Sequence, residues 1–469
     1  MQLRLFRHFV PASVVVLASS DALLIAAAFY HMLARPGAGP SVVFAVSRLP
    51  IPLSIGLSVA AVGAMIAIGL YAHQSFVDFR LLASKIAVAF IIVLVLVLVA
   101  VSYWRDGPHN MPDAAALPLK AALIWLGCIS VTRGAFLATL GRGLLKRRVI
   151  VLGSGAQAAR IAGLVESGES PHFVPLAFIG MPGERSCVKT DSFDWAAAGP
   201  DGFADLGCRI GASEIVVASD ERRGLPVRQL LRCKLAGMRV TDFLDFWERE
   251  TRTVDLEALK PSWLFYSDGF RCRMIDRIAK RTFDVTVSMA LLVLTLPLLA
   301  VVACLIKLET PGPTLYRQVR VGLRGRPFQI LKFRSMRVDA ELDGRARWAA
   351  RKDPRITRVG AVIRKLRIDE LPQVLNVLRG DMSFVGPRPE RPVFVEELGR
   401  TIPYYAERHW VRPGITGWAQ INYPYGASIE DARRKLSFDL YYVKNQSIFL
   451  DFVILLQTAR VIFWNHGAR

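Results

Sequence analysis

The segment VTVSMALLVLTLPLLAVVACLI, residues 285–306, decides how the fold of this chain is read. It is long enough to cross a bilayer, since about 20 apolar residues span the hydrocarbon core as a helix. Lys280 and Arg281 precede it and a group of cations beginning with Lys307 follows it, so both flanks carry the charge typical of the cytoplasmic side of a membrane. Pro297 lies near its middle, where a proline removes a helical hydrogen bond and bends the chain.

We therefore predict that residues 284–308 form a re-entrant helix, which dips into one leaflet, breaks at Pro297 and returns to the same face. The alternative is a straight fifth span with a proline kink. That alternative would place the rest of the chain on the outer side of the membrane.

The first part of the chain predicts a four-helix transmembrane domain over residues 1–145. Asp21 inside the first segment, and the further spans after it, favour an uncleaved helix over a signal peptide. The fourth segment carries Lys120 and Arg133, which would have to snorkel or face protein neighbours. Cations before the first segment and after the fourth place both ends of this domain in the cytoplasm. The four segments are Val10 to Tyr30, Pro50 to Tyr71, Ile86 to Tyr103, and Leu117 to Leu140.

Composition agrees with a membrane part joined to a globular part. Of 469 residues, 52% are hydrophobic and 21% are charged, and the two kinds concentrate in different stretches. The net charge of +21 is compatible with nucleic acid, anionic lipid or phosphorylated substrates, and charge alone does not choose among them. The 6 cysteines form no C-x-x-C pair, which argues against a zinc site or a disulfide framework and favours a reducing compartment.

Residues 146–268 predict a Rossmann-like α/β domain. Gly153, Gly155 and Ala158 follow a short β-run and open a helical pattern in G-x-G-x-x-A order, the context of a nucleotide-binding fingerprint. The acidic residue expected about 20 positions later is missing, because the next strand ends at Gly180. We therefore favour a structural or regulatory domain over one that uses a dinucleotide.

Residues 269–469 hold the constellation that predicts chemistry, in VIRKLRIDELPQVLNVLRGDMSFVGPRPE. Pro372 is tolerated only in a first helical turn, so a helix should begin near Asp369 and end before Gly380. Asp369 and Glu370 then lie at a helix N-terminus, which favours ionised carboxylates and bound phosphate. The plain alternative is an Asp N-cap followed by a first-turn Glu.

Neighbouring helical positions point about 100° apart, so the two carboxylates should have different tasks. One would contact phosphorus and the other would hold a metal, for which Mg²⁺ or Mn²⁺ bound by Asp369 and Glu370 is suitable. Arg364 and Arg388 would neutralise a diphosphate as it is split, and the basic stretch with Lys332 and Arg334 suits the same charge.

Several ordered blocks from about Arg277 to the C-terminus resemble the bacterial sugar transferases that act as polyprenyl-phosphate hexose-1-phosphate transferases. The blocks are KRTFDVTVSMALL, TPGPTLYRQVRVG, LKFRSMR, DPRITRVG, IDELPQVLNVLRGDMSFVGPRPE, RPGITGWAQIN and KLSFDLYYVKNQSIFLD. The four-helix and Rossmann-like parts also resemble the larger members of that family.

The resemblance implies a monotopic phosphoglycosyltransferase core with a re-entrant helix broken at Pro297, on the cytoplasmic face of a bacterial inner membrane. It implies that Asp369 attacks the phosphorus bearing the sugar and expels UMP, with Glu370 and magnesium assisting. Arg388 and Arg364 would grip phosphates, and Arg367 would be a further phosphate contact or face lipid headgroups. The implied partners are a UDP-sugar, with glucose preferred, polyprenyl phosphate and anionic lipids.

No nucleic acid is expected as a partner, and a homodimer is left open. The predicted role is the first step of exopolysaccharide or capsule repeat-unit assembly. Two rival functions remain open at this point: a membrane-anchored nucleotide-sugar oxidoreductase or dehydratase, which would rest on the G-x-G-x-x-A pattern, and a non-enzymatic scaffold of a polysaccharide assembly complex.

Overall fold

The computed structural model describes most of the chain. The described residues are 2–5, 8–33, 50–71, 79–105, 117–141, 146–167, 172–188, 192–194, 202–221, 223–267, 269–270, 273–337, 355–424, 426 and 428–464. The chain divides into two compact units, residues 1–5 with 9–251 and residues 6–8 with 252–469.

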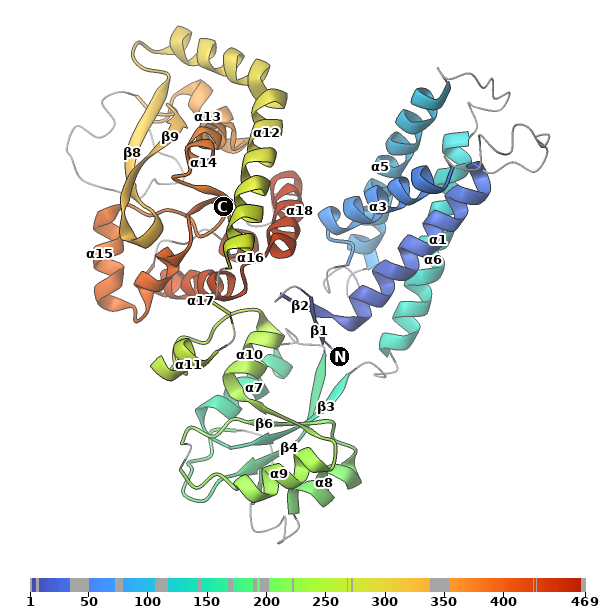
Figure 1. Ribbon diagram of the computed structural model, residues 1–469, viewed down its shortest axis with the longest axis vertical. Coiled ribbons are helices and arrows are strands. Elements are labelled where there is room, and N and C mark those ends of the chain that lie inside the picture. Colours follow the sequence, from blue (N-terminus) through green and yellow to red (C-terminus); the bar gives the residue numbers. More distant parts are fainter. Residues whose placement is uncertain are drawn as a thin grey trace. The chain divides into compact units, whose positions relative to one another are not determined.

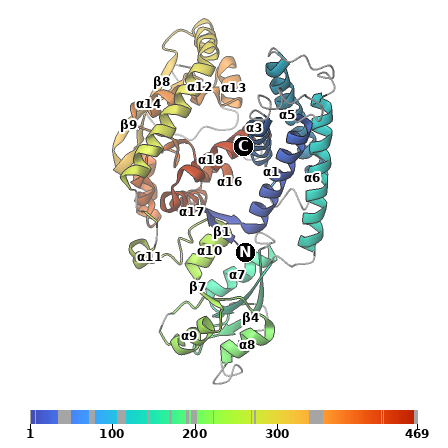
Figure 2. The ribbon, with the colours of Figure 1, turned by 45° about the vertical axis from the view of Figure 1, so that its right-hand side comes forward.

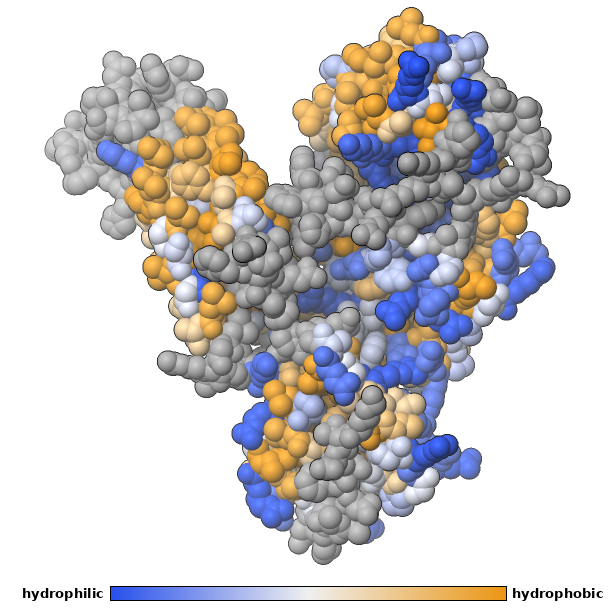
Figure 3. All heavy atoms as spheres, turned by 180° about the vertical axis from the view of Figure 1, so that it is seen from behind, coloured by the Kyte–Doolittle hydropathy of each residue, from blue (hydrophilic) through white to orange (hydrophobic). Residues whose placement is uncertain are grey.

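Four long helices form the N-terminal part, as predicted (Figure 1). They are α1 (Ala12–Leu33), α3 (Pro50–Ile68), α5 (Phe79–Arg105) and α6 (Leu117–Gly141), preceded by the short strands β1 (Gln2–Leu5) and β2 (His8–Pro11). In the described residues, α1, α5 and α6 are long and apolar enough to cross a membrane, and the apolar part of α3 is shorter. Figure 3 shows hydrophobic surface over this part of the chain. The exposed apolar side chains of the four helices include Val16, Val59, Ile91 and Val131.

A buried polar cluster ties these helices together. Asp21 on α1 is fully buried, and its Oδ2 lies 3.0 Å from Arg133 Nη1 on α6. The Tyr71 hydroxyl donates to the same oxygen at 2.7 Å. Arg133 therefore faces protein neighbours, one of the two arrangements expected for a cation inside an apolar helix.

The middle region contains a five-stranded parallel sheet in the order β5-β4-β3-β6-β7, the doubly wound order of Rossmann-type folds. The strands are β3 (Arg147–Leu152), β4 (Phe173–Gly180), β5 (Ser192–Asp194), β6 (Glu214–Val217) and β7 (Arg239–Asp242). The helices are α7 (Ala156–Glu166), α8 (Gly202–Ile210), α9 (Val227–Leu235) and α10 (Phe243–Thr251). Figures 1 and 2 show α7 and α10 over one face of the sheet and α8 and α9 over the other.

The second unit is built around one long helix, α12 (Met274–Glu309), and an antiparallel pair, β8 (Leu315–Val321) with β9 (Pro327–Phe333). Further along the chain, β10 (Ser383–Val385) and β11 (Gly414–Thr416) form a parallel pair. The remaining helices are α11 (Pro261–Tyr266), α13 (Arg358–Lys365), α14 (Val374–Arg379), α15 (Pro392–Thr401), α16 (Trp418–Asn422), α17 (Ile429–Asn445) and α18 (Ile448–Trp464), with 3₁₀ turns η2 (Leu323–Gly325), η3 (Ile368–Gln373) and η4 (Tyr405–Trp410).

Helix α12 runs continuously through Pro297, whereas the sequence predicted that the helix breaks there. Its axis bends instead, as Figure 1 shows between its lower and upper halves. Side chains on its apolar stretch are strongly exposed, Val293 at 66% and Leu294 at 80%. The proline thus bends the helix without ending it.

Both halves of α12 pack on the same unit. In the first half, Arg281 donates to the Val377 and Leu378 carbonyls at the end of α14, at 2.6 and 2.7 Å. At the far end, Glu309 accepts from the backbone N–H groups of Arg358 and Val359, at 2.6 and 3.0 Å. The two ends of the apolar helix are therefore anchored to one globular body.

Candidate active site

The local backbone separates the two acidic side chains. Arg367 follows α13 in the left-handed region, with φ 58° and ψ 17°, and turns the chain into η3. This conformation costs a non-glycine residue about 1 kcal/mol or more. Asp369 and Glu370 occupy the first turn of η3, which continues into α14 and ends at Gly380, with φ 96°. The predicted helix is therefore a 3₁₀ turn followed by a short α-helix, and neither residue is the N-cap.

Glu370 is buried and paired with two cations. Its Oε1 lies 2.7 Å from Arg388 Nη2 and 3.1 Å from Lys332 Nζ, and its Oε2 accepts from Arg388 Nη1 at 3.5 Å. Burial alone would raise the pKa of Glu370, but Arg388 and Lys332 outweigh it and hold that pKa well below its usual range. Glu370 is therefore a permanently charged anchor for the two cations.

Asp369 is the contrasting member of the pair. Among the described residues, no hydrogen bond or ion pair engages its half-buried carboxylate. Burial, and then the negative charge of Glu370, raise the pKa of Asp369 above its usual range, while Lys332, Arg364 and Arg367 act in the opposite direction. An unpaired carboxylate among cations is available to react with an electrophilic, negatively charged group.

Lys332 is held in place through β9. The fully buried Asn376 on α14 accepts from the Leu331 N–H at 2.9 Å and donates to the Gln329 carbonyl at 2.7 Å. Burial lowers the pKa of Lys332, and Glu370 counters that effect. The structure thus brings together five of the predicted residues around one point: Asp369, Glu370, Lys332, Arg364 and Arg388, with Arg367 exposed at the rim.

Arg334 does not join this group. Its guanidinium is buried and donates to the Pro311 carbonyl at 2.7 Å and to the Thr310 carbonyl and hydroxyl at 2.7 and 2.9 Å. Side chains two residues apart on a strand share a face, and for this reason the sequence predicted Arg334 at the same site as Lys332. Instead, Arg334 donates to the turn after α12, and its phosphate contact stays a prediction.

Glycines pack the RPGITGW block beneath the loop that carries Arg388. A Cβ on Gly414 would clash with the Gly386 backbone N, and a Cβ on Gly417 with the Gly386 carbonyl. The Gly386 N–H donates to the Thr416 carbonyl at 2.8 Å. This close backbone approach explains why small residues occur in both blocks.

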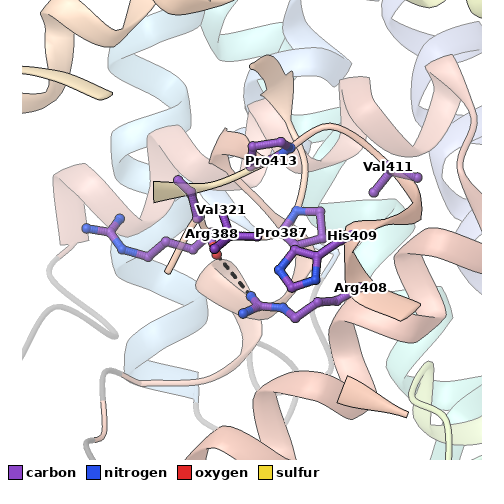
Figure 4. Close-up of a pocket in the computed structure, with 8 residues that line it drawn as sticks. Val321, Pro387, Arg388, Arg408, His409, Val411 and Pro413 are labelled. Atoms are coloured by element: carbon purple, nitrogen blue, oxygen red, sulfur yellow. Dashed lines mark hydrogen bonds between the residues drawn. The ribbon is translucent and has the colours of Figure 1, made fainter. Parts of the chain in front are cut away.

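Sequence reasoning missed Arg408, which lies behind this loop. Arg408 and Asp439 form a buried pair with Arg408 Nη2 2.7 Å from Asp439 Oδ2, and Arg320 donates to the Pro389 carbonyl at 3.1 Å. A small pocket lies here, away from the acidic pair, and Figure 4 shows Arg388 extending out of it. Its lining residues are Val321, Pro387, Arg388, Pro389, Arg408, His409, Val411 and Pro413. Arg408 and Asp439 are distant in sequence, and only their unusual burial as charges marks them.

The glycine turn of the middle domain is occupied by the chain's own carboxylates. Asp220 accepts from the Ala156 and Gln157 N–H groups at the start of α7, at 2.8 and 3.2 Å. Glu184 accepts from the Ser154 N–H at 2.9 Å and from the Asp220 N–H at 3.1 Å. The N–H groups of Ser154, Ala156 and Gln157 are the ones that a Rossmann domain offers to a pyrophosphate.

The three residues of the G-x-G-x-x-A pattern serve this packing. Gly153 has φ 129°, and a Cβ there would clash with the Ala218 carbonyl. A Cβ on Gly155 would clash with the Asp220 carboxylate. Ala158 is fully buried on α7. The pattern therefore predicted the turn correctly, and the predicted nucleotide contact stays a prediction.

Comparison with known proteins assigns the second unit. Residues 275–465 match the family model described as Bacterial sugar transferase. A UDP-N-acetylgalactosamine-undecaprenyl-phosphate N-acetylgalactosaminephosphotransferase of Aeromonas hydrophila is 44% identical over 266 residues, which cover 56% of this chain and 62% of that protein. An undecaprenyl-phosphate glucose phosphotransferase of Komagataeibacter xylinus is 48% identical over 195 residues, 40% of this chain and 36% of that protein.

These two matches cover less than two thirds of the relatives' own lengths. A UDP-glucose:undecaprenyl-phosphate glucose-1-phosphate transferase of Caulobacter vibrioides is 46% identical over 188 residues, which cover 40% of this chain and 70% of that protein. The matched region contains the acidic pair, the cations around it and the bent helix. On this match, the chain belongs to the bacterial sugar transferase family.

Proposed function

We propose that this chain transfers a sugar-1-phosphate from a UDP-sugar to polyprenyl phosphate and releases UMP. The observation that carries the proposal is the unpaired Asp369 beside a fully paired Glu370, among Lys332, Arg364 and Arg388. Names of similar proteins specify both glucose and N-acetylgalactosamine, so the sugar is stated as a hexose or N-acetylhexosamine, glucose being the sequence-based expectation.

The arrangement supports a two-step exchange at phosphorus. An Asp369 oxygen forms a bond to the phosphorus that bears the sugar, and the bond from that phosphorus to the bridging oxygen of UMP breaks, with the electron pair leaving on UMP. An oxygen of polyprenyl phosphate then forms a bond to the same phosphorus, and the Asp369 carboxylate leaves with its electrons. The products are UMP and a polyprenyl diphosphate sugar.

The cations supply the electrostatic part of this reaction. A diphosphate carries charge that grows on the leaving phosphate as the bond breaks, and fixed cations stabilise that charge. Arg388 and Lys332 are preorganised by Glu370, so they need no rearrangement when the substrate binds. Arg364 and the exposed Arg367 shortly precede the acidic pair in sequence and act electrostatically on Asp369.

The residues present offer one carboxylate, that of Asp369, to a magnesium ion. Glu370 already pairs with Lys332 and Arg388, whereas Asp369 is unpaired and could hold Mg²⁺ or Mn²⁺ together with substrate phosphate oxygens. The described residues contain no group of three or more His, Cys, Asp or Glu side chains suited to a metal. When bound, the ion would supply further neutralisation of the diphosphate.

We also propose that α12 enters one leaflet and returns, which keeps the site on the cytoplasmic face. At 1.5 Å per residue, each arm of the apolar stretch on either side of Pro297 is roughly 15–20 Å long, too short for a core about 30 Å thick. Val302 and Ile306 near the helix end pack with Phe333 and Ile363, while Arg281 holds the other half to α14. A straight span would separate these two contacts by the membrane.

The test is UMP release from a panel of UDP-sugars by purified protein with polyprenyl phosphate. We expect Asp369→Asn to lower the rate by at least about a thousandfold, as loss of a nucleophile does. Asp381→Asn is the matched control, because Asp381 is an exposed acid of the same segment, and it should retain the rate of the unmodified protein.

Extraction of a lipid-linked labelled sugar identifies the donor. Release that persists unchanged in Asp369→Asn would refute the assignment of the nucleophile. If no UDP-sugar yields UMP, the proposed transferase activity itself is wrong, and the scaffold function becomes the better reading.

A further inference from the structure

The loop that carries Arg388 is fixed at four successive carbonyl groups. The Gly414 N–H donates to the Pro387 carbonyl at 2.9 Å, and the Val321 N–H donates to the Glu390 carbonyl at 3.0 Å. Between them, Arg408 Nη2 donates to the Arg388 carbonyl at 3.0 Å and Arg320 Nη1 to the Pro389 carbonyl at 3.1 Å. Each backbone acceptor from residue 387 to residue 390 therefore has a donor.

Arg408 is the buried member among these donors. Its side chain is 6% exposed, and its Nε and Nη2 reach Asp439 Oδ2 at 3.1 and 2.7 Å. Its Nη1 donates to the Tyr405 hydroxyl at 2.8 Å. Figure 4 shows the remaining contact, the dashed line from Arg408 to the carbonyl oxygen of Arg388, while the Arg388 side chain extends the opposite way.

This geometry connects the pair to the site through the backbone of one residue. The Arg388 carbonyl binds Arg408, and the Arg388 guanidinium binds Glu370 at 2.7 Å. A buried guanidinium is costly unless each donor is satisfied. Asp439 and Tyr405 accept hydrogen bonds from the Arg408 guanidinium and hold it in place. Arg408 Nη2 is thereby directed at the Arg388 carbonyl.

We propose that Arg408, held by Asp439, is a positioning residue that fixes the backbone of Arg388 and so places the Arg388 guanidinium on Glu370. The proposal rests on the proposed transferase function, because Arg388 matters only if the Asp369 and Glu370 pair is the reaction centre. Arg408 itself touches neither acidic residue of that pair.

The experiment is a double-mutant cycle on UMP release. Arg408→Met should lower kcat/KM by about 10- to 100-fold, the effect of a small misplacement of a group that meets the substrate. In an Arg388→Lys background, where the bidentate contact with Glu370 is already lost, the same change should cost only about threefold or less. A role in general stability would lower both backgrounds equally.

Two further variants keep the test sharp. Arg400→Met is the matched control, because Arg400 is 77% exposed in an ion pair with Glu396, and it should leave kcat/KM unchanged. If Arg408→Met does not fold, the paired variant Arg408→Met with Asp439→Leu takes its place in the cycle. That variant removes the ion pair without leaving a buried charge, which many proteins tolerate.

The outcomes separate this inference from the function on which it rests. A loss in Arg408→Met that disappears in the Arg388→Lys background supports it. An equal loss in both backgrounds, or no loss, overturns it while unmodified protein still releases UMP. Absence of release by the unmodified protein with every UDP-sugar would instead refute the transferase function.

Discussion

At the scale of single residues, Asp369 and Glu370 are adjacent, yet their pKa values shift in opposite directions and only Glu370 has ion-pair partners among the described residues. Glu370 lies against Lys332 and Arg388, so its ionised form is strongly favoured. Asp369 interacts electrostatically with Lys332, Arg364 and Arg367, and its pKa is raised by burial and by Glu370. A raised pKa indicates a more basic carboxylate, which is the more nucleophilic form once ionised.

The pH dependence of kcat/KM should report the ionisation of Asp369. The reactive form is the carboxylate, so the rate falls as pH drops through its pKa. Arg364 lowers that pKa, so Arg364→Gln should move the acidic limb of the profile to higher pH. The midpoint of the acidic limb can be measured even if the variant lowers the maximal kcat/KM. Arg379→Gln, an exposed arginine of the same segment, should leave the limb in place; an equal shift in both variants would contradict the argument.

Arg334 and Arg367 should respond oppositely to the same replacement. Arg334→Met removes buried charged hydrogen bonds to residues 310 and 311 and should destabilise the protein by about 1.5–3 kcal/mol. Arg367→Met removes an exposed cation near the dyad, and should raise KM for the UDP-sugar with little change in stability. Thermal unfolding and KM, measured on both variants, check this contrast, and a reversed pattern would support a phosphate role for Arg334.

At the scale of elements, local patterns predicted most strands and helices. The sequence predicts strands at residues 174–179, 214–218 and 238–241, and these correspond to β4, β6 and β7 within a residue or so. The three-residue β5 was not predicted, because so short a strand has no periodic signal. The helix expected to begin near Asp369 appears as η3 followed by α14, with Pro372 inside η3 just before α14 begins.

The turn before α7 allows a direct test of the middle domain. Asp220→Ala removes the carboxylate that accepts from two N–H groups at the start of α7, and should destabilise the protein by about 0.5–2 kcal/mol. UMP release should not change, because Asp220 lies outside the second unit. Thermal unfolding and the release assay provide the measurement, with Asp205→Ala on the exposed first turn of α8 as control. Tight retention of NAD by the unmodified protein would contradict occupation of the turn by Asp220.

At the scale of the whole molecule, the topology of α12 decides which side of the membrane holds the site. The sequence is compatible with a straight span, because the apolar stretch is long enough, and with a re-entrant helix, because both flanks are positively charged. Contacts of both helix halves with one unit favour the returning path. The relevant physical fact is that a spanning helix cannot have both ends on a single globular body on one side of the bilayer.

Cysteine labelling checks this topology. In a background in which the other native cysteines are serine, Arg277→Cys and Lys307→Cys mark the two ends of α12, and the exposed Cys187 marks the middle domain. A membrane-impermeant maleimide should label all three in vesicles of the same orientation. If Lys307→Cys reacts only in the orientation in which Cys187 is protected, α12 spans the membrane and the proposed topology is wrong.

The sequence by itself determined the number and order of the long apolar helices, the glycine turn, the bend at Pro297 and the residues rich enough in charge to form a site. Each of these depends on neighbours within a few positions, such as apolar length, a proline ring or a helix start. Only the tertiary structure decided that Glu370 is paired and Asp369 is not, that Arg334 binds the end of α12, and that Asp220 fills the turn of the middle domain. Those outcomes depend on which donors meet which acceptors across long sequence separations, and hydrogen-bond partners are set by packing rather than by local pattern.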